Sequence, residues 1–206
     1  PKGTEHPSHI WLYRAASREL QQFTNGPKPE SHPRWSPDGK RLAFLCERED
    51  FKQICVIPTD GGEAKPLTEG KRSIADFAWS PDGKQIAFLA PEPKTDEEEK
   101  KEKDKDDARV VDRDDKQPHL WLADSTTGKA HLVTGKPWSF SDLQWSPSGS
   151  RLIVVATDHP ESDQETNRIF SLAVPDGKMQ QIAAPKGSFG ELRSSPDGKQ
   201  IAYAGC

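Results

Sequence analysis

Histidines near the amino terminus are the first side chains that could do chemistry, because imidazole is a common metal ligand. His6, His9 and His32 lie within one stretch of the sequence. A structural zinc site has four ligands at short, characteristic spacings, and these three residues match none of the standard patterns. We therefore expect structural or surface roles for them. The sequence predicts neither a metal site nor a cofactor site.

A hydrolytic nucleophile is the second chemistry to consider. No Gly-x-Ser-x-Gly segment occurs, so the strained strand-to-helix turn that exposes the nucleophile of an α/β-hydrolase is absent from these 206 residues. A phosphate-binding glycine-rich loop and a His-Glu-x-x-His pair are absent as well. Asp76 and Asp142 each precede a tryptophan by three residues, which indicates turn or strand-entry groups and not a catalytic pair. The sequence predicts no catalytic residue, and this stretch alone should be hydrolytically inert.

Three side chains remain as candidate contacts with a partner or substrate. Trp138 lies outside the tryptophan positions that recur in the chain, which makes its indole the best candidate for an exposed aromatic contact. Arg109 and Arg113 belong to a less polar segment, 108–113, within a long charged insertion. This segment is a candidate for docking on the rest of the chain or on a second domain.

One five-residue unit, Trp-Ser-Pro-Asp-Gly, divides the chain. It occurs at 35–39 and 79–83, at 145–149 with Ser in place of Asp, and at 194–198 with Ser in place of Trp. Proline fixes φ at the first central position of a tight turn, and glycine accepts the left-handed conformation that closes it. The unit is therefore a hairpin turn. The copies begin 44, 66 and 49 residues apart, which indicates an underlying unit of ~40 to 50 residues with loops of variable length, the period typical of propeller blades. Packing between neighbouring blades accounts for Trp35, Trp79 and Trp145, and likewise for Trp11 and Trp121 at a second recurring position.

The segments after each turn predict the strands. The runs 41–45, 85–89, 151–155 and 200–204 are apolar at consecutive positions, which is typical of strands buried on both faces. A third strand begins near 10, 54, 120 and 169, and a shorter fourth strand ends in Leu-Thr-x-Gly or a related signal. His119 stands at the start of a third strand, where we expect an ordinary solvent-edge position.

These elements predict an all-β protein, a β-propeller of four-stranded antiparallel blades. Complete blades are expected at 30–69, 73–135 and 139–184, with half blades at 8–26 and 188–206. Two arrangements fit this order. Either the chain is part of a larger propeller, or the two half blades pair and close a four-bladed ring.

The strand order also sorts the loops. The Pro-Asp-Gly turns lie at one end of the blades, and the insertions 47–53, 91–118 and 157–167 lie at the other. Binding commonly resides in variable loops on a rigid scaffold, so partners are expected at the insertion end. The largest insertion, 91–117, contains 12 acidic and 8 basic residues, a composition that favours disorder.

Composition excludes some classes of function. The net charge of the chain is −4, which equals that of the insertion 91–117, so the remainder is neutral. A neutral remainder gives no support for binding to nucleic acid or to an anionic membrane. No apolar run approaches the ~20 residues of a membrane span. Cys46 and Cys55 would lie close across a hairpin, but two buried free thiols are favoured over a bridge.

The repeats Trp-Ser-Pro-Asp-Gly-Lys-x-[Leu/Ile]-Ala-[Phe/Tyr], followed by [Ile/Leu]-Trp-Leu and Leu-Thr-x-Gly, resemble those of TolB-like proteins and of the prolyl oligopeptidase family of serine peptidases. The acidic insertion, the segment 108–113 and the run 117–122 are most similar to bacterial acylaminoacyl-peptidase and dipeptidyl-peptidase-like members. The resemblance covers nearly all of the chain outside 91–117.

The resemblance implies a non-catalytic propeller that filters peptide substrates for an α/β-hydrolase domain located carboxyl-terminal in the same polypeptide. It implies no catalytic residue here, because no position matches the nucleophile, acid or base motifs. The paired glutamates that bind a peptide amino terminus in dipeptidyl peptidases are not seen either. The alternative is a TolB-like periplasmic protein-binding scaffold without an enzyme. Both the bacterial cytoplasm and the periplasm remain open as the compartment.

Overall fold

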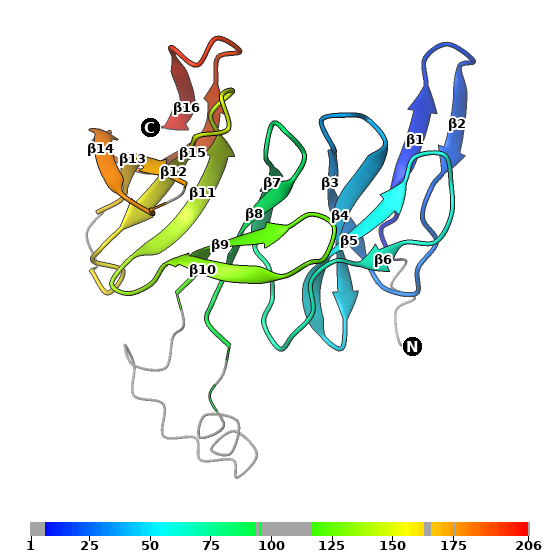
Figure 1. Ribbon diagram of the computed structural model, residues 1–206, viewed down its shortest axis with the longest axis horizontal. Helices are drawn as coiled ribbons and strands as arrows, with labels where there is room; N and C mark the ends of the chain where they lie inside the picture. Colours follow the sequence, from blue (N-terminus) through cyan, green and yellow to red (C-terminus); the bar gives the residue numbers. More distant parts are fainter. Residues whose placement is uncertain (1–6, 94, 96–116, 163–165, 175, 206) are drawn as a thin grey trace.

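The chain folds into β-strands in a computed structural model that describes residues 7–93, 95, 117–162, 166–174 and 176–205. The described residues contain no helix, and therefore no helix that could cross a membrane. Figure 1 shows the strands as a curved row of separate sheets. The all-β propeller fold with four-stranded antiparallel blades, predicted from the repeats, is confirmed.

Three sheets are complete blades in which each strand pairs with the next in sequence. Blade 1 contains β3 (Glu30–Trp35), β4 (Arg41–Arg48), β5 (Phe51–Pro58) and β6 (Lys65–Pro66). Blade 2 contains β7 (Asp76–Trp79), β8 (Gln85–Ala90), β9 (His119–Asp124) and β10 (Ala130–Thr134). Blade 3 contains β11 (Ser139–Trp145), β12 (Arg151–Thr157), β13 (Arg168–Ala173) and β14 (Met179–Ala183).

Two-stranded sheets stand at the two ends of the row. The amino-terminal half blade is β1 (Trp11–Arg14) paired with β2 (Glu19–Gln22), and the carboxyl-terminal half blade is β15 (Phe189–Ser194) paired with β16 (Ile201–Gly205). The half blades are not paired with each other in this structure; they lie at opposite ends of the row (Figure 1). The chain is therefore an open arc and not a closed ring of four blades.

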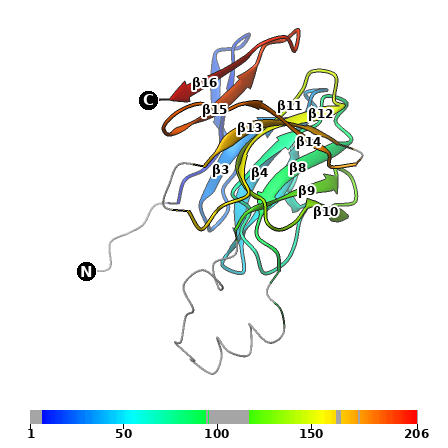
Figure 2. The ribbon, with the colours of Figure 1, turned by 90° about the vertical axis from the view of Figure 1, so that its left-hand side faces the viewer.

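The core lies between the faces of successive sheets, which Figure 2 shows one behind another. The second strands β4, β8 and β12 are buried along almost their whole length, as their consecutive apolar residues predict. One cluster joins blades 1 and 2 through Ile54, Phe77 and Phe88, and a second joins blades 2 and 3 through Leu122 and Phe140. Each interface is thus a small core shared by two blades.

The second strand of the carboxyl-terminal half blade, β16, departs from the expectation. The run 200–204 predicts a strand buried on both faces, yet most of β16 is exposed. The cause is structural: in blades 1 to 3 the second strand lies between first and third strands, whereas β16 pairs with β15 alone.

A disulfide joins Cys46 on β4 to Cys55 on β5, so the preference for free thiols was wrong. In the ladder Cys46 faces Gln53 and Cys55 faces Phe44, so the two cysteines are diagonal neighbours. Their Cα atoms are 5.9 Å apart, within the range that a bridge spans. Both side chains are buried in the cluster between the amino-terminal half blade and blade 1.

Candidate functional site

Hydrogen bonds to side chains close the Ser-Pro-Asp-Gly turns, which lie at one end of the blades. In the first turn Ser36 Oγ donates to Asp38 Oδ1 at 2.6 Å, and the Lys40 N–H donates to the same oxygen at 3.1 Å. The hydrogen bond from Ser36, followed by that from Lys40, lowers the pKa of Asp38 below its ordinary value. Asp82 and Asp197 repeat this geometry and the lowered pKa. These aspartates are committed to their turns, so they serve structure and not catalysis.

Tryptophans at the end of the first strand of a blade connect that strand to the first strand of the preceding blade. Trp79 Nε1 donates to the Arg34 carbonyl of blade 1 at 3.2 Å, and Trp145 Nε1 donates to the Ala78 carbonyl of blade 2 at 3.1 Å. Trp79 and Trp145 are 8% and 6% exposed, which confirms the expected packing between blades. The expectation was wrong for Trp35, which is 53% exposed, because β1 and β2 leave its side of blade 1 uncovered.

The turns themselves pack in a row. A Cβ added to Gly83 would lie 3.5 Å from Pro37 Cδ, and one added to Gly149 would lie 3.5 Å from Pro81 Cδ. Pro147 and Gly198 repeat the contact at 3.4 Å. The proline of each turn thus lies against the glycine of the next, and only Gly39 of the four turn glycines has open space around it.

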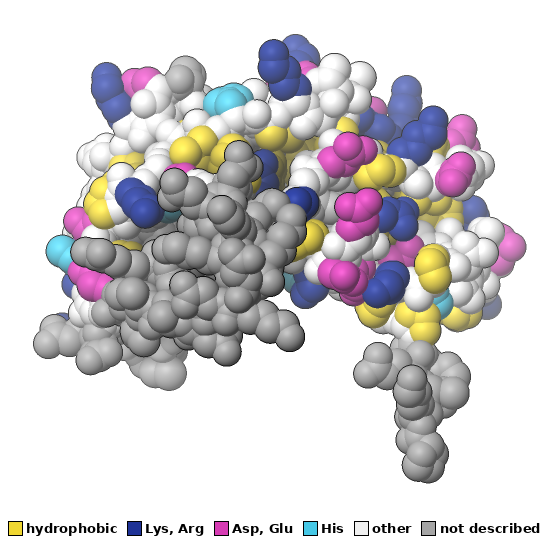
Figure 3. All heavy atoms as spheres, turned by 90° about the horizontal axis from the view of Figure 1, so that it is seen from below, with side chains coloured by type: hydrophobic (Ala, Val, Ile, Leu, Met, Phe, Trp, Pro, Cys, Tyr) yellow, Lys and Arg dark blue, Asp and Glu magenta, His cyan; other side chains and the backbone are white. Residues whose placement is uncertain are grey.

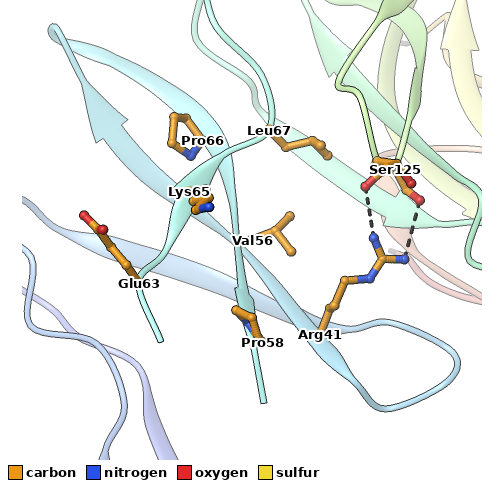
Figure 4. A pocket seen from close by; sticks show the side chains of 9 residues that line it. Arg41, Val56, Pro58, Glu63, Lys65, Pro66, Leu67 and Ser125 are labelled. Atoms are coloured by element: carbon orange, nitrogen blue, oxygen red, sulfur yellow. Dashed lines mark hydrogen bonds between the residues drawn. The ribbon is translucent and has the colours of Figure 1, made fainter. Parts of the chain in front are cut away.

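A cleft of about 490 Å³ opens between blade 1 and the β9–β10 turn of blade 2. Figure 4 shows Val56 and Leu67 on its wall and the Arg41 guanidinium directed at Ser125. Arg41 donates to the Ser125 carbonyl at 3.0 Å and to the Gly83 carbonyl at 3.2 Å, and it stacks on Trp79 at 4.7 Å. Because the guanidinium already has these protein partners, the cleft is a joint between blades rather than a prepared anion site.

The insertion end presents a mixed surface. Seen from that end in Figure 3, the acidic and basic side chains of the described residues that are in view are interspersed with hydrophobic ones. Arg72, on the connection from blade 1 to blade 2, stacks over Trp121 at 3.8 Å, and burial lowers its pKa. Within the described part of the chain, no group of three metal-ligating side chains is found.

The sequence-derived candidates do not converge on one site. Trp138 is partly buried and meets Phe170 edge to face, with ring centroids 5.0 Å apart, so only part of its indole can contact a partner. Arg109 and Arg113 lie outside the described residues. The same holds for the insertion 91–117, whose expected disorder concerns residues of which the structure describes only the two ends. The contact role of all three side chains stays a prediction.

Three further positions differ from expectation. His119 is buried instead of lying at the solvent edge, and its Nε2 is 3.8 Å from Glu92 Oε1. Asp142 is an acceptor between blades and not a strand-entry group, because its Oδ2 accepts the Leu192 N–H of the carboxyl-terminal half blade at 2.9 Å. Trp11 is 55% exposed, whereas Trp121 at the equivalent position lies beside Phe88, and the Arg72 guanidinium covers both rings. The outcomes for Asp142 and Trp11 cannot be read from residue type, since each depends on which blade lies alongside.

Sequence comparison relates the chain to peptidases. It is 43% identical over 65 residues to the protein named Uncharacterized peptidase YuxL of Bacillus subtilis (strain 168). That stretch is 31% of this chain but 10% of YuxL, so the match spans a small part of the relative's length.

Structural comparison gives the same fold. TolB from Acinetobacter baumannii superposes with a TM-score of 0.65 and 20% identity over 95% of this chain and 42% of its own. An acylaminoacyl peptidase in complex with a chloromethyl ketone superposes with a TM-score of 0.58 and 20% identity, over 92% of this chain and 29% of its own. A sequence profile described as the TolB beta propeller domain matches residues 3–114, more than half of the chain. With its repeated turns and four-stranded blades, the chain belongs to the TolB beta-propeller family and is related to the propellers of peptidases.

Proposed function

We propose that this chain is the propeller segment of a prolyl oligopeptidase family serine peptidase, in which it restricts the access of peptides to a hydrolase domain of the same polypeptide. The observation that carries the proposal is the 43% identity to a protein named as a peptidase. The hydrolase would supply nucleophile, acid and base. The propeller would supply selection by size.

The contacts between blades support a filtering role, because a filter must hold its shape. The tryptophan hydrogen bonds, the proline–glycine contacts and the Arg41 joint each tie one blade to the next. They lie toward the Pro-Asp-Gly end, which leaves the connections at the insertion end free to differ between blades. A rigid arc with variable loops at one end is the arrangement that commonly carries binding.

The first test is to read the native reading frame beyond Cys206. A Gly-x-Ser-x-Gly segment with Asp and His downstream is expected. A natural polypeptide with no hydrolase domain would contradict the proposal. The second test uses that natural polypeptide and compares its hydrolysis of a short acylated peptide with that of the same peptide embedded in a long chain.

Loosening the joint between blades 1 and 2 should alter this selectivity. Trp79→Phe removes the hydrogen bond to the Arg34 carbonyl while keeping an aromatic ring in the interface. We expect hydrolysis of the long substrate to rise relative to the short one, with kcat for the short peptide unchanged. Leu20→Ala, at an exposed position on β2, is the control. An unchanged ratio in both variants would count against filtering by the propeller.

A second candidate is a TolB-like periplasmic protein-binding scaffold without an enzyme. The superposition on TolB over 95% of the chain favours it. This function requires the natural protein to appear in the periplasmic fraction and to bind a Tol-type partner. The peptidase function requires neither, so fractionation and co-purification distinguish the two.

A further inference from the structure

We propose that the Arg72 guanidinium binds the carboxylate of a peptide at the insertion end of the joint between blades 1 and 2. Arg72 lies on the connection between these blades, and its Cζ is 3.8 Å from the ring centroid of Trp121 on β9. The same atom is 5.8 Å from the ring centroid of Phe88 on β8. The inference concerns binding alone, so it goes beyond the proposed function and applies to a peptidase and to a scaffold alike.

The Nη1 atom of Arg72 is a buried hydrogen-bond donor that has no acceptor among the described residues. Buried donors in folded proteins are almost always paired, because an unpaired one has lost its hydrogen bonds to water. Burial alone shifts the pKa of Arg72, downward, and no acidic group of the described chain counters that shift. The guanidinium therefore has a charge and a donor that the described residues do not use.

Arg41 shows that this condition is particular to Arg72. Both arginines stack on a tryptophan at the joint between blades 1 and 2. The Arg41 guanidinium donates to the carbonyls of Ser125 and Gly83, so it is committed to the joint. Holding the two blades together thus accounts for Arg41, whereas it leaves the buried donor of Arg72 unexplained.

The repeat indicates which chemistry suits the position of Arg72. Lys28, Arg72 and Trp138 stand at the same repeat position, on the connection that leads into a first strand. Lys28 Nζ pairs with Glu47 Oε1 at 2.8 Å, whereas Trp138 meets an aromatic ring edge to face. Where this position holds a cation with a partner, that partner is a carboxylate. A guanidinium suits the same group still better, because its planar fork donates two parallel hydrogen bonds to a carboxylate.

The backbone around Arg72 is fixed in the absence of a ligand. Gln53 Nε2 donates to the Arg72 carbonyl at 2.8 Å, and Gln53 is only 2% exposed. The Ile74 N–H donates to the Lys52 carbonyl at 2.9 Å, which holds the next part of the connection on β5. Arg72 itself is only partly buried, so a ligand can approach its exposed side. A donor that is already held in place loses little conformational entropy on binding.

A second unpartnered atom lies on the same face of blade 2. His119 precedes Trp121 by two residues on β9, so both side chains are on one face of the strand. His119 is 3% exposed, and its Nδ1 has no hydrogen-bond partner among the described residues. Two of the three buried side-chain atoms without a partner in the described chain therefore lie on this face.

The charges on this face favour a ligand with a single negative charge. Glu92 Oε1 is 3.8 Å from His119 Nε2, so an acidic group stands beside the proposed site. A phosphate, which carries up to two charges at neutral pH, would be repelled more strongly by Glu92 than a carboxylate would. We therefore assign the ligand as a peptide carboxylate, either of an acidic side chain or of a carboxyl terminus.

Small probes that differ only in charge test the proposal on the natural polypeptide. Acetyl-glutamate amide is compared with acetyl-glutamine amide, and acetyl-alanine with acetyl-alanine amide. We expect ligand-observed NMR titration to give, for at least one carboxylate, a dissociation constant about tenfold lower than that of its neutral counterpart. The pair with the larger ratio identifies the source, an acidic side chain or a carboxyl terminus. Equal constants within both pairs overturn the proposal, including the case in which another carboxylate of the polypeptide occupies Arg72.

Variants assign the binding to this guanidinium. Arg72→Gln removes the charge and should abolish the preference for the carboxylate probe. Arg72→Lys keeps the charge without the planar fork and should retain only part of that preference. Lys52→Gln removes an exposed positive charge at the same end of the molecule and is the matched control, which should keep the full preference. Equal loss in Arg72→Gln and Lys52→Gln would indicate general attraction by positive charge and would overturn the assignment to Arg72.

Inorganic phosphate tests the class of ligand. Because Glu92 stands beside the site, phosphate should bind the natural polypeptide more weakly than the preferred carboxylate probe. Tighter binding of phosphate that is lost in Arg72→Gln would overturn the assignment of a carboxylate.

Discussion

At the turn end of the blades, single residues add specific contacts to the hydrophobic core that neighbouring blades share. At the joint between blades 1 and 2, Trp79 supplies a ring and a hydrogen bond, and Arg41 covers that ring. The β9–β10 turn of blade 2 approaches blade 1 so closely that a Cβ on Gly128 would lie 1.9 Å from the Leu67 carbonyl oxygen. A substitution at such a contact should therefore cost more than the same substitution in an open turn.

Gly128→Ala and Gly39→Ala form a matched pair that isolates this contact. Both glycines are left-handed, with φ of +71° and +67°, but Gly39 has open space around it. Gly39→Ala should cost about 1–2 kcal/mol from backbone strain alone. Gly128→Ala should lose about 1–3 kcal/mol more by displacing Leu67. Urea unfolding of dilute protein measures the difference, and equal losses would mean that the turn does not touch Leu67.

At the scale of the element, the Ser-Pro-Asp-Gly turns are stabilised by ionised aspartates. Folding lowers the pKa of Asp38, Asp82 and Asp197 below the ordinary value of 3.8. A group whose folded pKa is lowered stabilises the protein above its unfolded pKa, and that contribution is lost as pH falls through the folded value. The third turn has Ser148 in the aspartate position, so it lacks this contribution.

The pH dependence of stability should follow the number of turn aspartates. From about pH 5 to pH 2, the triple variant Asp38→Ser, Asp82→Ser, Asp197→Ser should lose less stability than the natural chain. Ser148→Asp should lose more, because Ser146 Oγ lies 3.1 Å from the side-chain oxygen at that position and can donate to a carboxylate. Urea midpoints recorded across this pH range provide the measurement. Three parallel curves would show that these carboxylates do not contribute.

The hairpin of β4 and β5 is linked by its disulfide. In unfolded, unreduced protein purified under oxidising conditions, a thiol reagent should find one reactive cysteine, and after reduction it should find all three. Replacing Cys46 and Cys55 by alanine should lower the free energy of unfolding by about 2–3 kcal/mol, as for other short closed loops. Three reactive thiols before reduction would contradict the bridge.

The turns and strands could be predicted from the sequence wherever a local pattern of residues specifies them. The turns at 35–39 and 79–83 and the buried second strands follow from proline, glycine and consecutive apolar residues. The disulfide was missed because residue spacing alone does not show whether Cys46 faces Cys55 or lies diagonal to it. The exposure of Trp35 and the acceptor role of Asp142 were missed because they depend on the neighbouring sheet, which no local pattern specifies.

At the scale of the whole molecule, the stability of the isolated 206-residue chain should decrease from the centre of the arc towards its ends. In repeat architectures each unit is stabilised mainly by its neighbours, and the two half blades have a neighbour on one face only. We expect amide hydrogens of β1 and β16 to exchange faster than those of β8 and β12, which hydrogen-exchange mass spectrometry can follow strand by strand. Uniform protection in dilute protein would contradict this gradient.

The contact between the proline of one turn and the glycine of the next has a direction along the chain. The turns at Gly83, Gly149 and Gly198 each receive the proline of the preceding turn. Duplicating or deleting one whole unit leaves the remaining contacts of this kind intact, whereas replacing Pro37, Pro81 or Pro147 alone removes one of them. Evolution can therefore alter the length of such a chain in steps of a single repeat, by unequal recombination, without new side chains having to arise at the junctions.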